Sequence, residues 1–336
     1  MEGYGGKPIR IALIGVNRYS HSVQIHQRIQ QLSDYFEVVG IAFPENEEAR
    51  IPHFAEKFTH LPLLTVEQIL SDPTIEAVAV ETDEIYCTKY ALMAARAGKH
   101  VHMEKPGGRE LGDFEALIAT VKEKNLVFCP GYMYRYNPYV QELMAAIQKG
   151  ELGEILSVEA QMNCTHPTEQ RQWFTELPGG MLFYLGCHLI DLIYRIQGAP
   201  NKIHALSRPT FVEGAEGKDF GMAVLEYDRG VSFAKCISLE RGGYRRRQLV
   251  VTGTKATWEI KPLELGPEAG MTTSRTVYTE VRPWGHPGTG STSEPFDRYN
   301  NMLIHFARCV RGEIQNEYTP DYELALYKLL LQCCGV

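Results

Sequence analysis

The fold of this chain is decided by the stretch Gly98-Lys99-His100-Val101-His102-Met103-Glu104-Lys105-Pro106-Gly107-Gly108. Its residues 100–103 are compact and β-compatible, and they predict a short buried strand. The sequence Glu-Lys-Pro and then Gly-Gly ends this strand and turns the chain. Because the carboxyl ends of the strands border the ligand crevice of an open parallel sheet, we expect Lys105 to lie at such a crevice.

The chemistry of Lys105 follows from that position. Burial beside a ligand lowers the pKa of a lysine and lets it move protons. Pro106 fixes the turn, and a cis Lys105–Pro106 bond would suit this role. Taken alone, Glu104-Lys105-Pro106 fits a surface loop with a salt bridge better than a catalytic turn, so the interpretation depends on the rest of the chain.

Length and composition set the class of protein. A chain of 336 residues, 44% hydrophobic and 22% charged, is typical of a soluble globular protein with two domains. The formal charge of −7 argues against nucleic acid or an anionic membrane as partner, and no apolar run is long enough to span a membrane. We do not expect residues 1–6 to form a signal peptide. The eight cysteines form no CxxC pair, which predicts reduced core residues of a cytoplasmic protein and no metal site.

The first part of the chain alternates strands with helices. The expected strands cover 8–14, 36–43, 75–80, 100–103 and 126–129, and the expected helices follow Ser20 or Ser22 and cover 47–58, 85–97 and 110–124. This alternation predicts a parallel sheet with right-handed crossovers. We therefore expect an α/β fold whose residues 1–129 form a Rossmann-type dinucleotide-binding domain.

The pattern changes after Pro130-Gly131. Strands are expected at 154–162, 203–208, 220–227, 231–239, 244–253 and 256–260, with helices at 140–149, 180–197, 295–310 and 322–334 and a long loop at 262–295. Residues 130–336 thus predict an α+β domain with a large, open, mostly antiparallel sheet, which binds substrate and mediates oligomerisation. Because the uncovered sheet face needs a partner, we expect a homodimer or homotetramer.

Several motifs, taken together in their order and spacing, resemble those of the Gfo/Idh/MocA family of oxidoreductases over nearly the whole chain. They are Ile11-Ala-Leu-Ile-Gly15, Ala97-Gly-Lys-His-Val, Glu104-Lys105-Pro106, Gly131-Tyr-Met-Tyr-Arg135-Tyr-Asn-Pro138, Gly150-Glu-Leu-Gly153-Glu-Ile, Pro178-Gly-Gly180 with Gly186-Cys-His188-Leu-Ile-Asp191, and Val251-Thr-Gly253-Thr-Lys. The resemblance implies oxidation or reduction of a secondary alcohol on a sugar or polyol with NAD(H) or NADP(H).

Hydride transfer from a carbinol carbon leaves a hydroxyl proton that a side chain must accept. The resemblance assigns this region to Lys105 and His188. Tyr184, His188 and Asp191 have the spacing of one helix face. Tyr184 stands where the family commonly has Asp, and it could donate a hydrogen bond to the substrate, or it could be an aromatic core residue.

The cofactor loop departs from the dinucleotide fingerprint. Gly15-Val-Asn17-Arg18-Tyr-Ser20 keeps only the first glycine of G-x-G-x-x-G, and Asn17 places a side chain where the pyrophosphate approaches. Arg18 could add charge against a phosphate. Phe43 stands where an acidic residue would bind the adenine ribose. Glu45 and Glu47 are close but displaced, and no basic residue is near Phe43 in the sequence. We therefore expect NAD in preference to NADP, with binding weakened by the altered loop.

The remaining site residues come from the resemblance. Thr82 and Glu84 align with the Thr-Pro-Asn loop beside the nicotinamide, where Glu84 replaces an amide with a carboxyl group, and Glu104 and Lys105 complete the cofactor side. The residues expected on the substrate side are Arg135, His166, Trp173, Asp191 and His286. Trp173 could also be core, and the segment around His286 could be a surface loop.

Three functional hypotheses follow. The first is an NAD(H)-dependent oxidoreductase that acts on a secondary alcohol of a sugar, polyol or glycoside, with Lys105 and His188 in proton transfer. The second is a redox-neutral enzyme that oxidises a sugar transiently, eliminates or hydrates, and returns the hydride to retained NAD. The third is a binding protein that inherited the fold, and retention of Lys105 and His188 argues against it.

Overall fold

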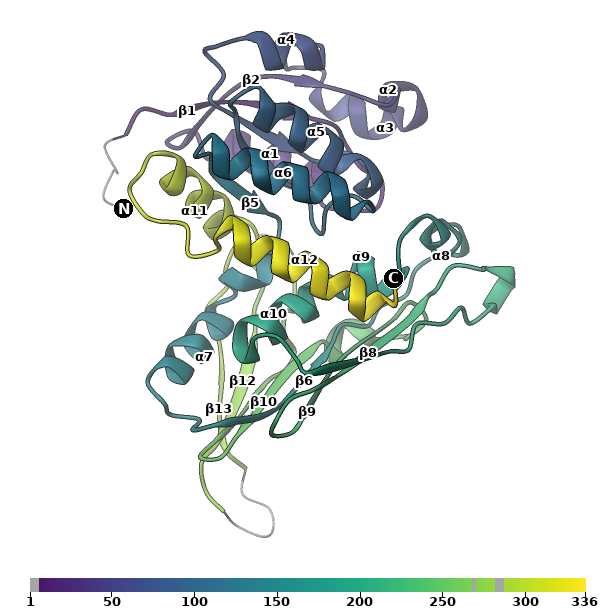
Figure 1. Cartoon of the computed structure of the whole chain (residues 1–336), viewed down its shortest axis with the longest axis vertical. Helices are drawn as coiled ribbons and strands as arrows, with labels where there is room; N and C mark the ends of the chain where they lie inside the picture. The colour runs from purple at the N-terminus through teal and green to yellow at the C-terminus, as the bar shows by residue number, and fades with distance from the viewer. Residues whose placement is uncertain (1–5, 268–269, 282–286) are drawn as a thin grey trace. The chain divides into compact units, whose positions relative to one another are not determined.

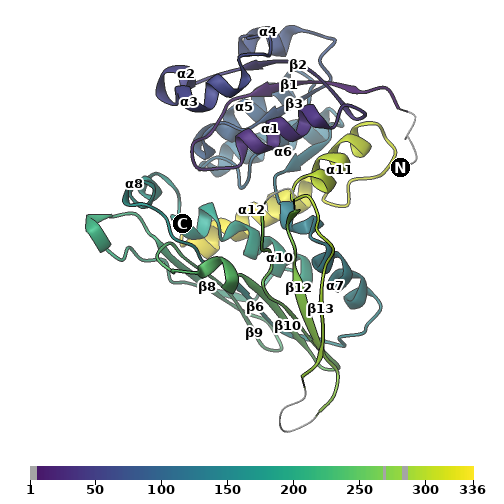
Figure 2. The same ribbon diagram turned by 180° about the vertical axis from the view of Figure 1, so that it is seen from behind.

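The computed structural model describes residues 6–267, 270–281 and 287–336. These residues form two compact units (Figures 1 and 2). The first unit contains the chain up to Gly131 together with Tyr299–Ala325, and the second contains Tyr132–Arg298 and Leu326–Val336. The expected boundary after residue 129 lies next to the observed division, but Tyr299–Ala325, which we expected in the second domain, groups with the first unit.

The first unit is built on a parallel sheet with strand order β2-β1-β3-β4-β5. The strands are β1 (Ile9–Ile14), β2 (Phe36–Ala42), β3 (Ala77–Val80), β4 (His100–Met103) and β5 (Phe128–Pro130). All residues of β3 are buried, as are most of β1, because helices cover both faces of the sheet. The expected Rossmann-type α/β arrangement is confirmed.

Helices lie on both faces of this sheet. α5 and α6 lie on one face in Figure 1, and α1 lies on the other, as the reverse view in Figure 2 shows. The helical segments of the unit are α1 (Ser22–Gln31), α2 (Glu47–Arg50), α3 (Pro52–Ala55), η1 (Glu56–Phe58), α4 (Val66–Ser71), α5 (Glu84–Arg96), α6 (Leu111–Glu123) and α11 (Asn300–Val310). The ring of Phe306 on α11 lies 5.9 Å from that of His102 on β4, which explains why this late segment belongs to the first unit.

Two expectations for this unit were wrong in detail. The helix expected at 47–58 is broken into α2, α3 and η1, because Pro52 has no backbone N–H to continue the hydrogen-bond ladder. Helix α4 was not expected at all. Its beginning carries a capping box between Thr65 and Gln68, a pattern that marks a helix start in the sequence.

The turn after β4 is formed as expected. The strand ends at Met103 as expected, and the Lys105–Pro106 bond is cis, the isomer that would suit the turn. β4 pairs in parallel with β3, with Val80 opposite Met103. Glu81 and Glu104, the next residues along these two strands, therefore lie together at the carboxyl edge of the sheet.

The second unit contains a large sheet with strand order β13-β12-β11-β10-β6-β9-β8-β7. Its strands are β6 (Ile155–Gln161), β7 (Lys202–Ala205), β8 (Phe220–Glu226), β9 (Val231–Ile237), β10 (Gln248–Gly253), β11 (Thr257–Ile260), β12 (Ser274–Tyr278) and β13 (Thr289–Thr292). β6 and β9 pair in parallel, and the other pairs are antiparallel, which confirms the mostly antiparallel sheet. The turn between β8 and β9 closes with a hydrogen bond from the amide of Tyr227 to the carbonyl of Gly230.

The stretch 262–295 is not simply a loop. β12 and β13 lie within it and extend the sheet, with Val277 opposite Thr289. The abundance of Gly, Ser, Thr and Pro concealed these strands, because short edge strands need little apolar content when one face is open to water. This expectation was therefore wrong.

The helix expected at 180–197 is two helices, α9 (Met181–Tyr184) and α10 (Cys187–Gln197). The break occurs at Gly186, where an added Cβ would lie 2.5 Å from the Leu182 side chain. Tyr184 thus lies on α9, whereas His188 and Asp191 lie on α10, so the single helical face that we expected for these three residues is wrong. The remaining helical segments of the unit are η2 (Met133–Tyr136), α7 (Pro138–Gln148), α8 (Thr168–Trp173), η3 (Phe174–Glu176), η4 (Val212–Gly214) and η5 (Gly243–Arg246).

One face of the large sheet carries helices and the other does not, within the described ranges. α10 contacts β6 and β9, and α7 contacts β11, all from the same side (Figure 1). On the outer face, Val224 and Phe233 are half-buried cross-strand neighbours. The final helix α12 (Pro320–Cys334) begins in the first unit and ends in the second. Among the described residues, every helix is too short or too polar to span a bilayer.

Candidate functional site

The loop after β1 lies against the loop after β3. Gly15 has a φ of +84°, and a Cβ at this position would lie 2.6 Å from the Thr82 Cβ. Only glycine fits here without strain, because both the backbone conformation and the close approach exclude a side chain. The retained first glycine of the fingerprint therefore has a packing role between two strand ends.

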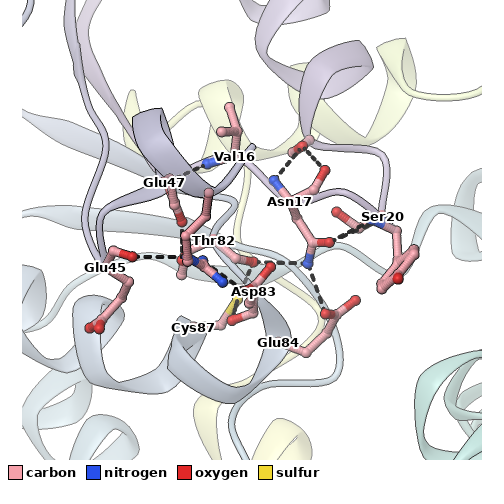
Figure 3. A network of polar contacts seen from close by, with 12 residues as sticks. Val16, Asn17, Ser20, Glu45, Glu47, Thr82, Asp83, Glu84 and Cys87 are labelled. Carbon is pink, nitrogen blue, oxygen red and sulfur yellow. Dashed lines mark hydrogen bonds and ion pairs between the residues drawn. The ribbon is translucent and has the colours of Figure 1, made fainter. Parts of the chain in front are cut away.

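Asn17, which replaces the second glycine, is buried and points into the protein (Figure 3). Its Nδ2 donates to Glu84 Oε2 at 2.8 Å and to the Thr82 carbonyl at 3.2 Å. Its Oδ1 accepts the backbone amides of Tyr19 at 2.8 Å and Ser20 at 3.3 Å. The amide side chain thus stabilises the loop from inside rather than protruding from it.

Glu47 ties the loop to its surroundings. One carboxyl oxygen accepts the Val16 amide at 2.9 Å, and the other accepts the Thr82 hydroxyl at 2.5 Å (Figure 3). Burial raises the pKa of Glu47 to about 8, while these two hydrogen bonds oppose the shift. The carboxyl group of Glu47 therefore occupies the backbone amide of Val16, one of the hydrogen-bond donors of the altered glycine loop.

Thr82 and Glu84, the two expected nicotinamide-side residues, are brought together with Asn17. Glu84 is completely buried at the beginning of α5, and burial raises its pKa to about 8, whereas the charge of Lys105 lowers it. Within the described part of the chain, Glu84 Oε1 has no hydrogen-bond partner. An uncompensated buried carboxyl oxygen indicates a place where a ligand group could donate.

Lys105 is buried at the carboxyl edge of the sheet, where its Nζ lies 3.1 Å from Glu104 Oε1. Glu81 lies beside Glu104, and burial first, then the like charge of Glu104, holds the pKa of Glu81 well above its usual range. His102 Nδ1 is 3.4 Å from Glu81 Oε1, and burial lowers the pKa of His102 to about 3. Lys105 therefore contributes a basic side chain to a buried cluster that also contains Glu81 and Glu104. Such a cluster is suited to proton transfer.

Phe43 lines a pocket of about 590 Å³ at the end of β2. Other walls come from Thr65 and Gln68 at the beginning of α4 and from Lys89 on α5. The expected absence of a basic residue near Phe43 holds only along the sequence. In the folded unit, Lys89 lines the same pocket and pairs with Glu45 at 2.6 Å.

The second unit contains the other expected catalytic residues. His188 is buried, and its ring packs edge-on against Tyr134 at 4.9 Å and Tyr132 at 5.8 Å between centroids. The Tyr184 ring lies 5.9 Å from His166 and 5.5 Å from Trp173. The fold thus gathers three expected residues, Tyr184, His166 and Trp173, into one aromatic cluster.

Arg135 and Asp191, both expected on the substrate side, bind each other. Arg135 Nη2 donates to Asp191 Oδ1 at 2.7 Å, and Arg135 Nε lies 3.0 Å from both carboxylate oxygens. Both side chains are at most 2% exposed. This bidentate pair links η2 to α10 and holds the helix that carries His188.

Two expected residues lie elsewhere. Arg18 is exposed, with its guanidinium 5.4 Å from the Tyr19 ring centroid, and His286 lies outside the described residues. Sequence reasoning considered Glu47 only as a displaced acidic residue near the ribose position and missed Glu81, although charged residues next to predicted strands are a usable signal. Within the described ranges, no group of three or more His, Cys, Asp or Glu side chains could hold a metal ion.

Models of two domains match this sequence. Residues 9–132 match the oxidoreductase family with an NAD-binding Rossmann fold, and residues 140–259 match the GFO/IDH/MocA C-terminal domain. The chain belongs to the Gfo/Idh/MocA family of oxidoreductases. The resemblance inferred from the motifs is confirmed.

Individual relatives of this family member share part of its sequence. The uncharacterized oxidoreductase YhhX of Escherichia coli is 32% identical over 41% of this chain and 40% of its own length. The scyllo-inositol 2-dehydrogenase (NADP(+)) IolW of Bacillus subtilis is 26% identical over 67% of this chain and 62% of its own length. Each of the two alignments thus covers less than two thirds of the length of the relative.

The fold is shared over almost the whole chain. An aldose-aldose oxidoreductase from Caulobacter crescentus, solved with glycerol, matches with a TM-score of 0.77 over 98% of both chains at 19% identity. At this identity the match concerns the fold alone. It supports the two-part architecture of a Rossmann-like unit and an open-sheet unit.

Proposed function

We propose that this family member is an NAD(H)-dependent oxidoreductase that acts on a secondary alcohol of a sugar, polyol or glycoside. The observation that carries the proposal is the position of Lys105, buried at the carboxyl edge of the parallel sheet and paired with Glu104 at 3.1 Å. Ligands bind at this edge of open α/β sheets. A lysine held there is placed for proton exchange with a substrate hydroxyl.

The residues of the first unit fit a dinucleotide. The pocket of about 590 Å³ at the end of β2 has a volume usual for ligand sites and suits the adenosine part. Gly15, Asn17 and Arg18 would border the pyrophosphate, Phe43 the adenosine, and Thr82 with Glu84 the nicotinamide. The cofactor, when bound, supplies the hydride acceptor or donor.

The protein's own residues perform the remaining chemistry. In the oxidation direction, the carbinol C–H bond breaks as hydride leaves, and the O–H proton passes to a basic side chain as the carbonyl forms. We assign this proton transfer to Lys105 and His188, with Tyr184 as a hydrogen-bond donor to the substrate. Glu104 positions the Lys105 amino group, whose neutral form can accept the proton, through the contact of 3.1 Å between Oε1 and Nζ.

The aromatic cluster of the second unit supports a carbohydrate or polyol substrate. Trp173, His166 and Tyr184 present the apolar ring faces on which the C–H face of a sugar packs well. The relative named for scyllo-inositol supports the same class. Arg135 and Asp191 contribute by holding α10, and His286 stays a proposed substrate contact.

We also propose that the protein is a cytoplasmic homo-oligomer. Its eight cysteines are buried thiols without a disulfide bond among the described residues, as expected in a reducing compartment. The half-buried outer face of the large sheet, which includes Val224 and Phe233, offers the self-association surface.

The proposed function is tested by absorbance at the nicotinamide wavelength during a screen of sugars, polyols and glycosides, together with release of bound dinucleotide on denaturation. Net NADH formation with one substrate class is the expected result. Retained cofactor and sugar conversion without net absorbance change would indicate the redox-neutral chemistry instead. Absence of any dinucleotide binding would contradict the proposal.

A further inference from the structure

Three carboxyl groups are buried around the amine of Lys105 in the first unit. Glu81 and Glu84 are not exposed at all, and Glu104 and Lys105 are each 3% exposed. Glu81 and Glu104 follow the ends of two neighbouring parallel strands, and the amide of Glu104 donates to the carbonyl of Val80 at 2.8 Å. The fold therefore holds these two carboxyl groups beside each other and next to one base.

One base cannot balance the charge of three ionised acids. The charge of Lys105 acts on both Glu81 and Glu84. The neighbouring histidines add no positive charge at neutral pH, because burial lowers the pKa of His102 to about 3 and that of His26 to about 4. An ionised carboxyl group without a cation is very costly away from water. We therefore expect at least two of the three carboxyl groups to keep a proton at neutral pH.

The surroundings of Glu81 indicate that this carboxyl group carries one of the protons. Neither of its oxygens accepts a hydrogen bond from a donor group among the described residues, and His102 Nδ1 lies 3.4 Å from Oε1. Its side chain is within hydrogen-bonding reach of the carboxyl group of Glu104. Two carboxyl groups bond to each other only when one of them is protonated. Because Glu104 Oε1 also lies 3.1 Å from Lys105 Nζ, Glu104 is the ionised partner and Glu81 the donor.

We propose that Glu81 donates a shared proton to Glu104 and thereby keeps Lys105 able to accept the proton of the substrate hydroxyl. An ionised Glu104 that faced Lys105 alone would favour the ammonium form of the lysine, which cannot accept a proton. The hydrogen bond from Glu81 draws the negative charge of Glu104 away from Nζ.

Glu81 is thus a positioning residue that acts through Glu104. In the transfer step the substrate O–H bond breaks and an N–H bond forms at Lys105 Nζ, while Glu81 keeps its own proton. This inference rests on the proposed function, since it assumes that Lys105 is the proton acceptor. The charge state of Glu81 and Lys105 can nevertheless be measured without a substrate.

The first measurement is the infrared spectrum of the full chain at neutral pH, without substrate or dinucleotide. A protonated carboxyl group absorbs at a carbonyl frequency that differs from that of a carboxylate. Glu81→Gln should remove one band of a protonated carboxyl group. The control Glu123→Gln, at an exposed position at the end of α6, should remove none. A Glu81→Gln spectrum that loses only carboxylate intensity would overturn the inference.

The second measurement is the pKa of Lys105, followed by NMR with lysine labelled at Cε, where Lys105→Met identifies the resonance. Glu81→Met removes the donated proton and keeps the length of the side chain, so the pKa of Lys105 should rise by about one unit or more. Glu81→Gln, whose amide group still donates, should keep the wild-type value. An unchanged pKa of Lys105 in Glu81→Met, or an equal rise in Glu81→Gln, would contradict the proposed role of Glu81.

The two measurements separate this inference from the proposed function. Either of them can overturn the role of Glu81 while turnover of a sugar or polyol by the wild type still supports the proposed function. With such a substrate, Glu81→Met should need a higher pH than Glu81→Gln for the same turnover. If Glu81→Met does not fold, the infrared band of Glu81→Gln decides alone. If the wild type converts no substrate, the proposed function fails and the role of Glu81 in catalysis fails with it.

Discussion

The Val16 amide donates a hydrogen bond of 2.9 Å to the buried carboxyl group of Glu47. Val16 belongs to the altered glycine loop, and Glu47 begins the short helix after β2. In this protein the loop is therefore held by its own acidic side chain. Burial raises the pKa of that side chain to about 8. The contribution of Glu47 to the stability of the protein should therefore depend measurably on pH.

We predict that Glu47 makes the protein less stable as the pH rises from about 4.5 to 8. The unfolded chain ionises Glu47 near the ordinary value of 4.5, whereas the folded chain keeps the proton until about pH 8. The folded state thus binds more protons in this window, so the free energy of unfolding falls as pH increases. The total loss should be roughly 3–5 kcal/mol.

This prediction is measured by urea unfolding of the wild type and Glu47→Gln between pH 5 and pH 8. Glutamine keeps an acceptor for Val16 and a donor for Thr82 but cannot ionise. The difference in unfolding free energy between the two proteins should therefore change in favour of the variant as pH increases. A difference independent of pH would show that Glu47 is not buried in its protonated form. The exposed neighbour changed in Glu48→Gln provides the control.

Replacement of Lys105 by Met should lower turnover by about 10²- to 10⁴-fold, the usual contribution of general acid–base catalysis. Methionine keeps most of the apolar stem, so the buried site should stay packed. Dinucleotide affinity should change far less, because the pyrophosphate and ribose contacts involve other residues. Lys124→Met, at an exposed position after α6, is the matched control.

Turnover and calorimetric titration are measured in parallel for Lys105→Met, with the substrate found in the screen. Wild-type turnover in this variant would make Lys105 a structural residue and the proposed mechanism wrong. His188→Asn should also lower turnover and leave dinucleotide affinity nearly intact, because His188 belongs to the second unit.

Asp191→Ala should destabilise the protein by about 3–5 kcal/mol, because it leaves the buried Arg135 guanidinium without its bidentate partner. Thermal and urea unfolding measure this effect. Exposed Asp321→Ala, which removes a surface ion pair with Lys122, should cost at most about 1 kcal/mol. A loss of activity in Asp191→Ala at unchanged stability would instead favour direct contact between Asp191 and substrate.

Light scattering at micromolar concentration should give the mass of a dimer or a tetramer of the 38.0 kDa chain. The expected surface is the outer face of the large sheet, where Phe233 lies opposite Val224. Phe233→Lys should shift the mass toward the monomer, because burying an unpaired ammonium group is costly. A wild-type mass of 38.0 kDa would refute the association.

Much of the fold could be predicted from the sequence, because periodicity and turn residues report local burial. The continuous apolar run of β3 and the abrupt end of β4 at Glu104-Lys105-Pro106 both indicated buried parallel strands. The family motifs located Lys105 and His188 on their elements. The prediction failed where local signals are weak, as in the polar edge strands β12 and β13.

The candidate site could be predicted only in part, because hydrogen-bond partners depend on which elements fold together. The sequence by itself determined the family, the Rossmann-like unit and the residue types at the strand ends. Tertiary structure decided that Lys89 pairs with Glu45, 44 residues earlier, and that Arg135 pairs with Asp191. These pairs form because burial brings distant charges together in a medium where an unpaired charge is costly, and no local pattern records that choice.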